Sequence, residues 1–354
     1  MLSRETVSKS QDNQGKARLE FFRFFGTILA VEVGILAYSV NKYGFAAMSN
    51  RGDGPQYMDY ASNLLSGNYS YPHFPMYPVF LRIASSILPL SVAAVVVSVT
   101  AYLLLIIVFW RTSAKLTVPA RNLLSFFISW FPPTLLIYSI LPYADSTALL
   151  FSALTYYFII TRREKSMLLC SVLAVVTHYL AILIFPGVVY YFLRKNAREA
   201  PKALITVAPV ILFSVYQYLV RGDLFYYVHV NTTFWSESGG LLSFPFSTIL
   251  YVIGNFGFFS LLLLVSTYAI YIIGLFLSIK YREIQSAVFA APYVVFVVFL
   301  GPGAFFFVPR FVEYAFPLLF NYGKLCGNRF VVALLFLITV TSVTYAIFRV
   351  TSLP

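Results

Sequence analysis

Apolar runs long enough to cross a lipid bilayer recur along the whole chain. The run from Tyr77 to Trp110 far exceeds the roughly 20 residues that one helical crossing needs. The sequence is 60% hydrophobic and 11% charged, whereas soluble domains have about 45–50% apolar and about 25% charged residues. We therefore predict an all-α protein, a polytopic transmembrane helical bundle of about 10–11 spans that forms one domain over residues 1–354.

Prolines and basic clusters divide these apolar runs. Pro89 is expected to separate a short interfacial helix from a full span, and Pro132-Pro133 to break the span over residues 123–141. Residues 166–193 lie between two basic clusters but are too few for two crossings. They predict a hairpin of two short helices that turns near Thr177-His178.

Basic and acidic residues lie in different sets of loops. Lys and Arg gather in the polar tail over residues 1–18, expected to be partly disordered, and in loops near residues 111–121, 162–165, 194–202, 280–282 and 324–329. The opposite loops, mainly residues 44–76 and 221–255, carry acids instead, namely Asp53, Asp59, Asp145, Asp223 and Glu237. This asymmetry predicts a multi-pass protein of the cell membrane or endoplasmic reticulum, with its N-terminus in the cytoplasm. The net charge of +12 therefore does not indicate nucleic-acid binding.

The first external loop, residues 44–76, holds the most promising acid. Asp53 lies between Gly52 and Gly54, which permit a sharp turn and the close approach of a substrate. A carboxylate there suits a general base acting on a hydroxyl, although Asp53 is equally suited to cap the short helix that begins at Pro55. Asp59 is off the helical face of Asp53, and we interpret it as a solvated or supporting residue beside the substrate.

Two of the three histidines lie in informative places. His73 belongs to a segment rich in proline and aromatic residues, where it is either an interfacial residue or a functional one. His178 lies at the turn of the predicted hairpin, and ionisable groups at membrane depth usually face a cavity. Glu32 and Glu313 invite the same argument, but each is also able to pair with a basic residue of the bundle.

Arg310 follows the segment 305–309, Phe-Phe-Phe-Val-Pro, at the outer end of a predicted span. Its guanidinium suits phosphate binding, and the alternative is an interfacial anchor. No zinc-like His/Cys spacing, phosphate-binding loop or dinucleotide motif is present in the sequence. We therefore expect no metal and no cofactor apart from a substrate that itself carries a phosphate.

Several motifs resemble, in the same order, those of the GT-C glycosyltransferases, especially the PIG-V type, the second mannosyltransferase of GPI-anchor assembly, and its prokaryotic relatives. The matching segments are 52–54 (Gly-Asp-Gly), 57–61, 73–78 (His-Phe-Pro-Met-Tyr-Pro), 143–146 (Tyr-Ala-Asp-Ser), 177–179 (Thr-His-Tyr) and 222–229, with Trp235 after it. Arg51-Gly52 replaces the family's Trp before the Asp, and His178-Tyr179 replaces its Arg-Pro.

The resemblance implies transfer of a sugar, mannose in the PIG-V type, from a polyprenyl- or dolichyl-phosphate donor to a hydroxyl of a lipid or glycan acceptor on the external or lumenal face. Asp53 would be the general base of an inverting reaction. Arg310, together with His73 or His229, would stabilise the departing lipid phosphate. Further residues on the substrate side would be His178, Asp59, Asp145 and Tyr77.

Two other functions remain open at this point. A transporter or flippase for a lipid-linked or small solute would explain buried ionisable groups and broken helices, but the chain has no internal repeat. A GT-C enzyme of another branch, such as an O-mannosyltransferase, would differ in its acceptor.

Overall fold

The computed structural model describes residues 4–64, 73–116, 121–236 and 242–351. Regular structure in these ranges is helical, apart from one isolated bridge between Leu242 and Leu300. The elements in chain order, with η for 3-10 helices, are α1 (Arg4–Ser49), α2 (Gly54–Ser62), α3 (Met76–Ala84), α4 (Leu90–Lys115), α5 (Arg121–Trp130), α6 (Thr134–Ser139), α7 (Asp145–Ile160), α8 (Glu164–Thr177), η1 (Tyr179–Ile184), α9 (Phe185–Lys195), η2 (Ala197–Thr206), α10 (Ala208–Arg221), α11 (Tyr226–Ser236), α12 (Ser247–Asn255), α13 (Phe258–Lys280), α14 (Ile284–Val298), η3 (Pro302–Phe307), α15 (Val308–Val312), η4 (Glu313–Leu325) and α16 (Arg329–Thr351).

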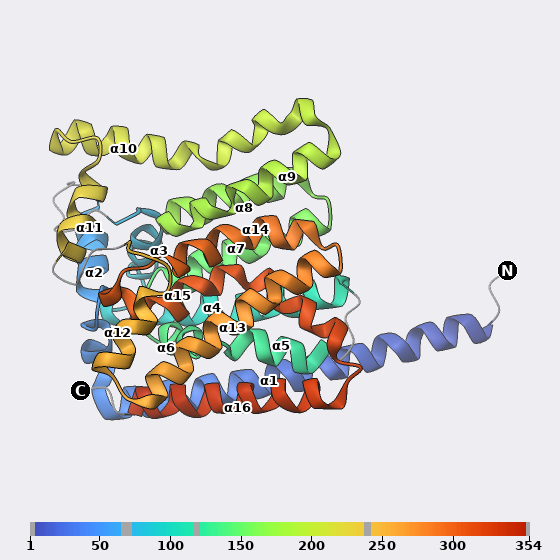
Figure 1. The fold of residues 1–354 in the computed structure, drawn as a ribbon. Coiled ribbons are helices and arrows are strands. Elements are labelled where there is room, and N and C mark those ends of the chain that lie inside the picture. The colour runs from blue at the N-terminus through green and yellow to red at the C-terminus, as the bar shows by residue number, and fades with distance from the viewer. Residues whose placement is uncertain (1–3, 65–72, 117–120, 237–241, 352–354) are drawn as a thin grey trace.

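Five described helical segments are long and apolar enough to cross a membrane. They are Arg18–Ser49, Leu90–Lys115, Ala197–Arg221, Phe258–Lys280 and Arg329–Arg349, and the apolar helices α7 and α14 are shorter. The predicted all-α, multi-pass membrane bundle is confirmed. Residues 4–18, expected to be a partly disordered tail, instead continue α1 as a helix (Figure 1). The reason is local, because Glu5, Lys9, Gln14 and Lys16 are good helix formers.

The predicted helix breaks occur where proline is present. Pro89 lies immediately before α4, and Pro132 and Pro133 separate α5 from α6. The hairpin also forms. Its chain turns at His178, which has an extended backbone, and Lys195 Nζ lies 2.5 Å from Glu164 Oε2 where the two ends meet. The short helix predicted from Pro55 is α2, whereas residues 65–72 and 237–241 of the two long polar loops lie outside the described residues.

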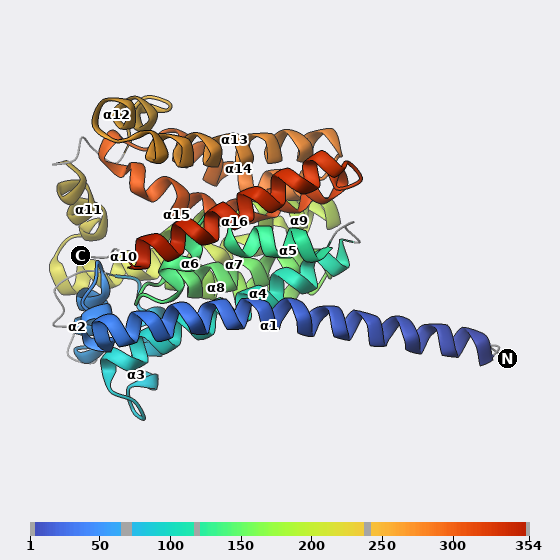
Figure 2. The same cartoon turned by 90° about the horizontal axis from the view of Figure 1, so that it is seen from below.

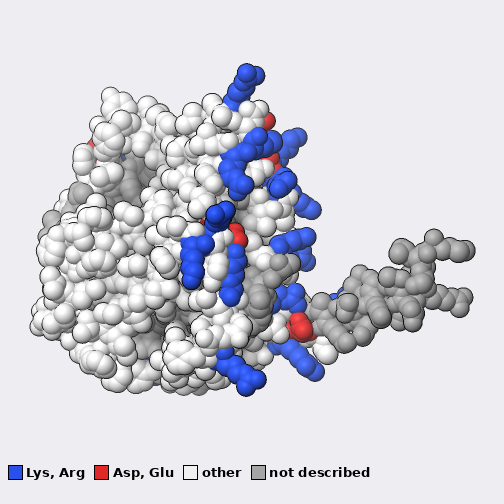
Figure 3. Space-filling model, turned by 45° about the vertical axis from the view of Figure 1, so that its right-hand side comes forward, with Lys and Arg blue, Asp and Glu red and all other residues white. Residues whose placement is uncertain are grey.

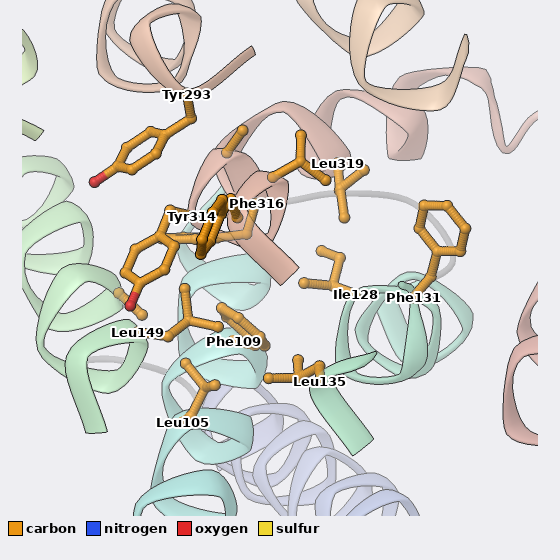
Figure 4. Packing of buried hydrophobic residues seen from close by; sticks show 14 of the residues in the cluster. Leu105, Phe109, Ile128, Phe131, Leu135, Leu149, Tyr293, Tyr314, Phe316 and Leu319 are labelled. Atoms are coloured by element: carbon orange, nitrogen blue, oxygen red, sulfur yellow. The ribbon is translucent and has the colours of Figure 1, made fainter. Parts of the chain in front are cut away.

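The 13-residue 3-10 helix η4 lies at the centre of the bundle. Every residue from Glu313 to Gly323 is buried. Figure 4 shows Phe316 and Leu319 of η4 among side chains from α4, α5 and α7.

Both buried glutamates accept hydrogen bonds from hydroxyl groups, Glu32 from Ser139 Oγ at 2.7 Å and Glu313 from Thr134 Oγ1. Neither has a basic partner among the ion pairs of the described residues, so the structure does not support the alternative of pairing with a Lys or Arg.

The two ends of the bundle differ in charge. α1 and α16 run in the same direction, so that Ser49 and Thr351 lie at one end of the bundle (Figures 1 and 2). Lys and Arg gather at the opposite end (Figure 3), where α4, α9, α13 and η4 finish with basic residues in their last turns. The end away from that basic surface carries Asp53 and Asp145, and we call it the acidic end.

Candidate active site

A buried ion pair forms the centre of the acidic end. Arg310 in α15 donates from Nε to Asp145 Oδ1 at 2.8 Å and from Nη2 to Asp145 Oδ2 at 2.7 Å. The two side chains are 4% and 2% exposed. The two parallel hydrogen bonds fix the orientation of both side chains, and each charge compensates the other. Asp145 begins α7, so the first turn of that helix also favours its negative charge.

Aromatic rings enclose the Arg310 guanidinium. Its central carbon lies 4.7 Å from the ring centre of Tyr143, 4.9 Å from that of Tyr138 and 5.5 Å from that of Phe307. Cation–π contacts of this kind gain strength when water is excluded, as it is around a buried arginine. The rings therefore hold the Arg310 side chain in place and restrict its movement toward solvent.

Asp53 lies beside this pair but is not part of it. Its Oδ2 atom is 3.7 Å from Arg310 Nη2, and its side chain is 38% exposed. Asp53 occupies the N-cap position of α2, yet its side chain makes no capping hydrogen bond. Desolvation raises the pKa of the Asp53 carboxyl above its ordinary value of 3.8, and the charge of Arg310 opposes that rise. The carboxylate is thus positioned by its neighbours while remaining open to a ligand.

Close contacts require glycine at both positions that flank Asp53. Gly52 has φ +51°, and a Cβ atom there would lie 1.5 Å from the hydroxyl oxygen of Tyr143. At Gly54 a Cβ atom would lie 2.1 Å from the carbonyl oxygen of Ser49. The Tyr143 hydroxyl also accepts a hydrogen bond from the Asp53 backbone N–H at 3.3 Å. At both glycines protein groups, and not a substrate, occupy the space where a side chain would lie.

Asp53 and Arg310 line a cavity of about 120 Å³, which we call the Asp53 cavity. Its other walls come from α2, the hairpin turn, α11 and the segment before α15. The remaining lining residues are Gln56, Tyr57, His73, Phe74, Thr177, His178, Tyr179, Tyr227, Asn231, Phe307 and Phe311. A small space with several converging polar groups, next to a carboxylate of raised pKa, is the usual form of a substrate site.

Both histidines of this cavity are held by neighbours. His73 stacks on Tyr57 with ring centres 4.0 Å apart, and its Nε2 lies 2.9 Å from Gln56 Oε1. Because that amide oxygen accepts, Nε2 of His73 carries the proton. Burial lowers the pKa of His73 to about 3, so its ring is neutral at pH 7. His178 Nδ1 accepts from the Leu180 backbone N–H at 3.3 Å, which leaves its proton on Nε2.

Besides Asp145, three predicted residues do not line the cavity. Tyr77 is buried, and its hydroxyl contacts Ser98 Oγ at 2.8 Å and the Ala94 carbonyl at 3.2 Å. Asp59 Oδ1 accepts from Asn63 Nδ2 at 2.9 Å. His229 is largely exposed, and its Nδ1 lies 2.7 Å from Asp223 Oδ2. Tyr77 joins α3 to α4, and the other two interact with residues of their own loops.

Sequence reasoning missed Gln56 and Tyr138. Gln56 is three residues after Asp53, a spacing that places both on one face of α2, so the signal was present. Tyr138 gave no such signal within its apolar run. The pairing of Arg310 with Asp145 joins residues 165 positions apart and depends on the packed bundle. Within the described residues, no three His, Cys, Asp or Glu side chains gather closely enough to hold a metal ion.

No protein-family model and no curated protein matches the sequence. Two solved structures are similar in fold. The crystal structure of ArnT from Cupriavidus metallidurans bound to undecaprenyl phosphate gives a TM-score of 0.56 at 13% identity, covering 86% of this chain and 60% of that chain. ArnT in the apo state gives 0.45 at 14% identity, covering 76% and 54%. This chain thus spans less than two thirds of ArnT's length, and the likeness shows a fold of the GT-C kind.

Proposed function

We propose that this chain is an integral-membrane glycosyltransferase that moves a sugar from a polyprenyl-phosphate carrier to an acceptor hydroxyl, with Asp53 as the general base. The observation that carries the proposal is the position of the Asp53 carboxylate. It lines a cavity and is 38% exposed, whereas the neighbouring Asp145 is fully engaged by Arg310. The GT-C-like fold supports the same reaction class.

In the proposed step, Asp53 accepts the proton of the acceptor hydroxyl as that oxygen bonds to the anomeric carbon. The bond between the anomeric carbon and the phosphate oxygen breaks, and the phosphate leaves with the bonding electron pair. Attack opposite to the leaving group inverts the configuration at that carbon. The raised pKa of Asp53 suits this role, since a carboxylate whose pKa lies closer to the operating pH is a better proton acceptor.

Cationic and N–H groups would stabilise the departing phosphate. Arg310 lines the Asp53 cavity and has five N–H donors, two of which bond to Asp145. The Nε2–H group of His178 lines the same space and adds a neutral donor, whereas the Nε2–H group of His73 already donates to Gln56 Oε1. Fixed donors aimed at developing negative charge are a large source of catalysis. We assign no such role to His229, since its ring pairs with Asp223 outside the cavity.

The donor class follows from two supports. ArnT, which shares the fold, was crystallised with undecaprenyl phosphate, and the motifs of residues 52–54 and 73–78 resemble those of enzymes that use lipid-phosphate sugars. Mannose and a lipid or glycan acceptor are proposed on the PIG-V-type resemblance. The basic surface at the far end of the bundle supports an external or lumenal position for Asp53.

The test uses purified full-length protein with radiolabelled mannosyl-phospho-polyprenol and a membrane glycolipid extract as the acceptor. We expect a labelled product that depends on the protein and disappears with Asp53→Asn. Asp223→Asn is the matched control, because Asp223 is an acid outside the Asp53 cavity and should keep full transfer. Retained transfer by Asp53→Asn would remove Asp53 from its role. No product with several donors, together with movement of the lipid across vesicle membranes, would favour a transporter.

A further inference from the structure

A groove adjoins the segment that holds Asp53, since Gly52 is one of its lining residues. Its outer part, of about 270 Å³, is lined by residues that include Arg51, Gly52 and Arg349. Its inner part, of about 320 Å³, runs between α13 and α16. The two parts share Leu263 and Tyr345, so they adjoin. We call the whole space the α13–α16 groove.

The polarity of this groove changes along its length. Arg51 and Arg349 line only the outer part, where α1 and α16 finish at the acidic end of the bundle (Figures 1 and 2). The inner part is lined by apolar side chains with the hydroxyls of Ser266, Thr341, Ser342 and Tyr345. No aspartate or glutamate is among the described lining residues of either part. The groove therefore favours a molecule with one anionic end and a long apolar body.

Both walls of the inner part are helices able to cross a membrane, α13 and α16. A groove between two such helices lies at the depth of lipid chains, so its apolar occupant would enter from the bilayer. Phosphate at the arginine end would then lie near the water boundary, which is where a lipid headgroup lies. This geometry matches a membrane lipid better than a soluble ligand.

Only a thin wall separates the groove from the proposed catalytic base. Gly52 lines the groove and the next residue, Asp53, lines the Asp53 cavity. Tyr138 and Tyr143 line the groove and also stack on Arg310. Gly52 is exposed, and the Tyr143 hydroxyl covers the position where a Cβ atom would lie, so a sugar attached to a phosphate in the groove would meet the Gly52–Asp53 peptide beside Tyr143.

We infer that the α13–α16 groove holds the lipid donor, with its isoprenoid chain between α13 and α16 and its phosphate at Arg51 and Arg349. The inference rests on the proposed function and extends it. It assigns the isoprenoid carrier to the groove, where Arg51 and Arg349 contact the phosphate, while Arg310 and His178 of the Asp53 cavity contact the same phosphate from the side of the acceptor hydroxyl during transfer.

Binding of undecaprenyl phosphate tests the assignment without turnover. The full-length protein, in detergent, is titrated with this lipid by native mass spectrometry, with undecaprenol and phosphatidylglycerol as competitors. We expect Arg51→Gln with Arg349→Gln to weaken binding about tenfold or more, since two charge-assisted contacts are lost. Arg82→Gln, an exposed arginine outside the groove at the acidic end, is the matched control and should bind normally.

The apolar part has its own variant. Ser266→Trp would fill the inner groove and should weaken binding of both undecaprenyl phosphate and undecaprenol about tenfold or more. Ile272→Trp is its control, because Ile272 lies on the same helix but is 40% exposed and outside the groove. Thermal unfolding of each variant shows whether it is folded.

The outcomes separate this inference from the proposed function. Unchanged lipid binding in folded groove variants, while the wild type still transfers sugar, would overturn the groove and leave the function standing. Equal competition by phosphatidylglycerol would also overturn it, because the groove would then be a site for ordinary lipid. Selective, groove-dependent binding without any transfer would support the groove and count against the glycosyltransferase.

Discussion

Removing one partner of the Arg310–Asp145 pair should destabilise the protein far more than removing a surface charge. Asp145→Asn keeps the shape of the side chain and removes its charge, leaving a guanidinium that is 4% exposed. Breaking a buried pair costs about 3–5 kcal/mol in the free energy of unfolding. We expect the lower part of that range, because Asp53 remains 3.7 Å from Arg310 and provides part of the missing charge.

The size of this effect is measurable by thermal unfolding in detergent. A loss of about 3 kcal/mol corresponds to a fall in Tm of roughly 5–10 °C, taking about 2–3 °C per kcal/mol for a chain of this size. Glu283→Gln is the matched control. It breaks the pair with Lys324, in which both side chains are more than a third exposed, so its cost should stay below about 1 kcal/mol.

A double-mutant cycle shows whether charge burial is the cause. Arg310→Met alone should also be strongly destabilising, because it strands the buried carboxylate of Asp145. The double variant Asp145→Asn with Arg310→Met strands no charge, so it should lose only about 1–3 kcal/mol, from the amide that lacks a partner. If the two single losses simply add, or if Asp145→Asn unfolds at the same temperature as Glu283→Gln, the pair does not hold the site together.

Three further predictions concern transfer activity. The initial rate should fall as the pH drops through the raised pKa of Asp53, because the base must be ionised. Arg310→Met removes a charge that lowers this pKa, so it should shift the fall in rate to higher pH, and a pH–rate profile measures the shift. Gly52→Ala should reduce transfer about a hundredfold by displacing Tyr143 and the adjacent Asp53, whereas wild-type rates would contradict the close contact. His178→Ala should lower transfer about tenfold, since it removes a donor from the cavity lining, and His229→Ala should change it by less than about twofold; equal losses would contradict the assignment of His178 to the cavity.

Much of the fold was predictable from local features of the sequence. Long apolar runs indicate spans because the hydrocarbon core has a fixed thickness. Pro89 and the Pro132-Pro133 pair indicate helix ends because proline lacks the N–H that a helix interior needs. The hairpin at His178 followed from length, since residues 166–193 cannot cross twice. Each of these arguments uses neighbours in the sequence only.

The site was less predictable because its contacts join distant segments. Histidine is scarce in this chain, and this drew attention to its three histidines. Scarcity does not reveal which face of a helix lines a cavity. In α11, Tyr227 and Asn231 line the Asp53 cavity, whereas His229, two residues from each, pairs with Asp223. Similarly, the sequence indicated that Arg310 seeks an anion but did not distinguish a ligand phosphate from Asp145.

The different surroundings of the two aspartates explain why one is suited to chemistry and the other to support. One guanidinium faces two carboxylates, so the group carries a net negative charge when both are ionised. Asp145 takes both short hydrogen bonds and is buried, which commits its charge to Arg310. The excess negative charge therefore resides on Asp53, at 3.7 Å from the guanidinium and open to the cavity. A proton is accepted most readily where negative charge is least compensated, so proton transfer to Asp53 relieves the excess without breaking the pair that holds the site.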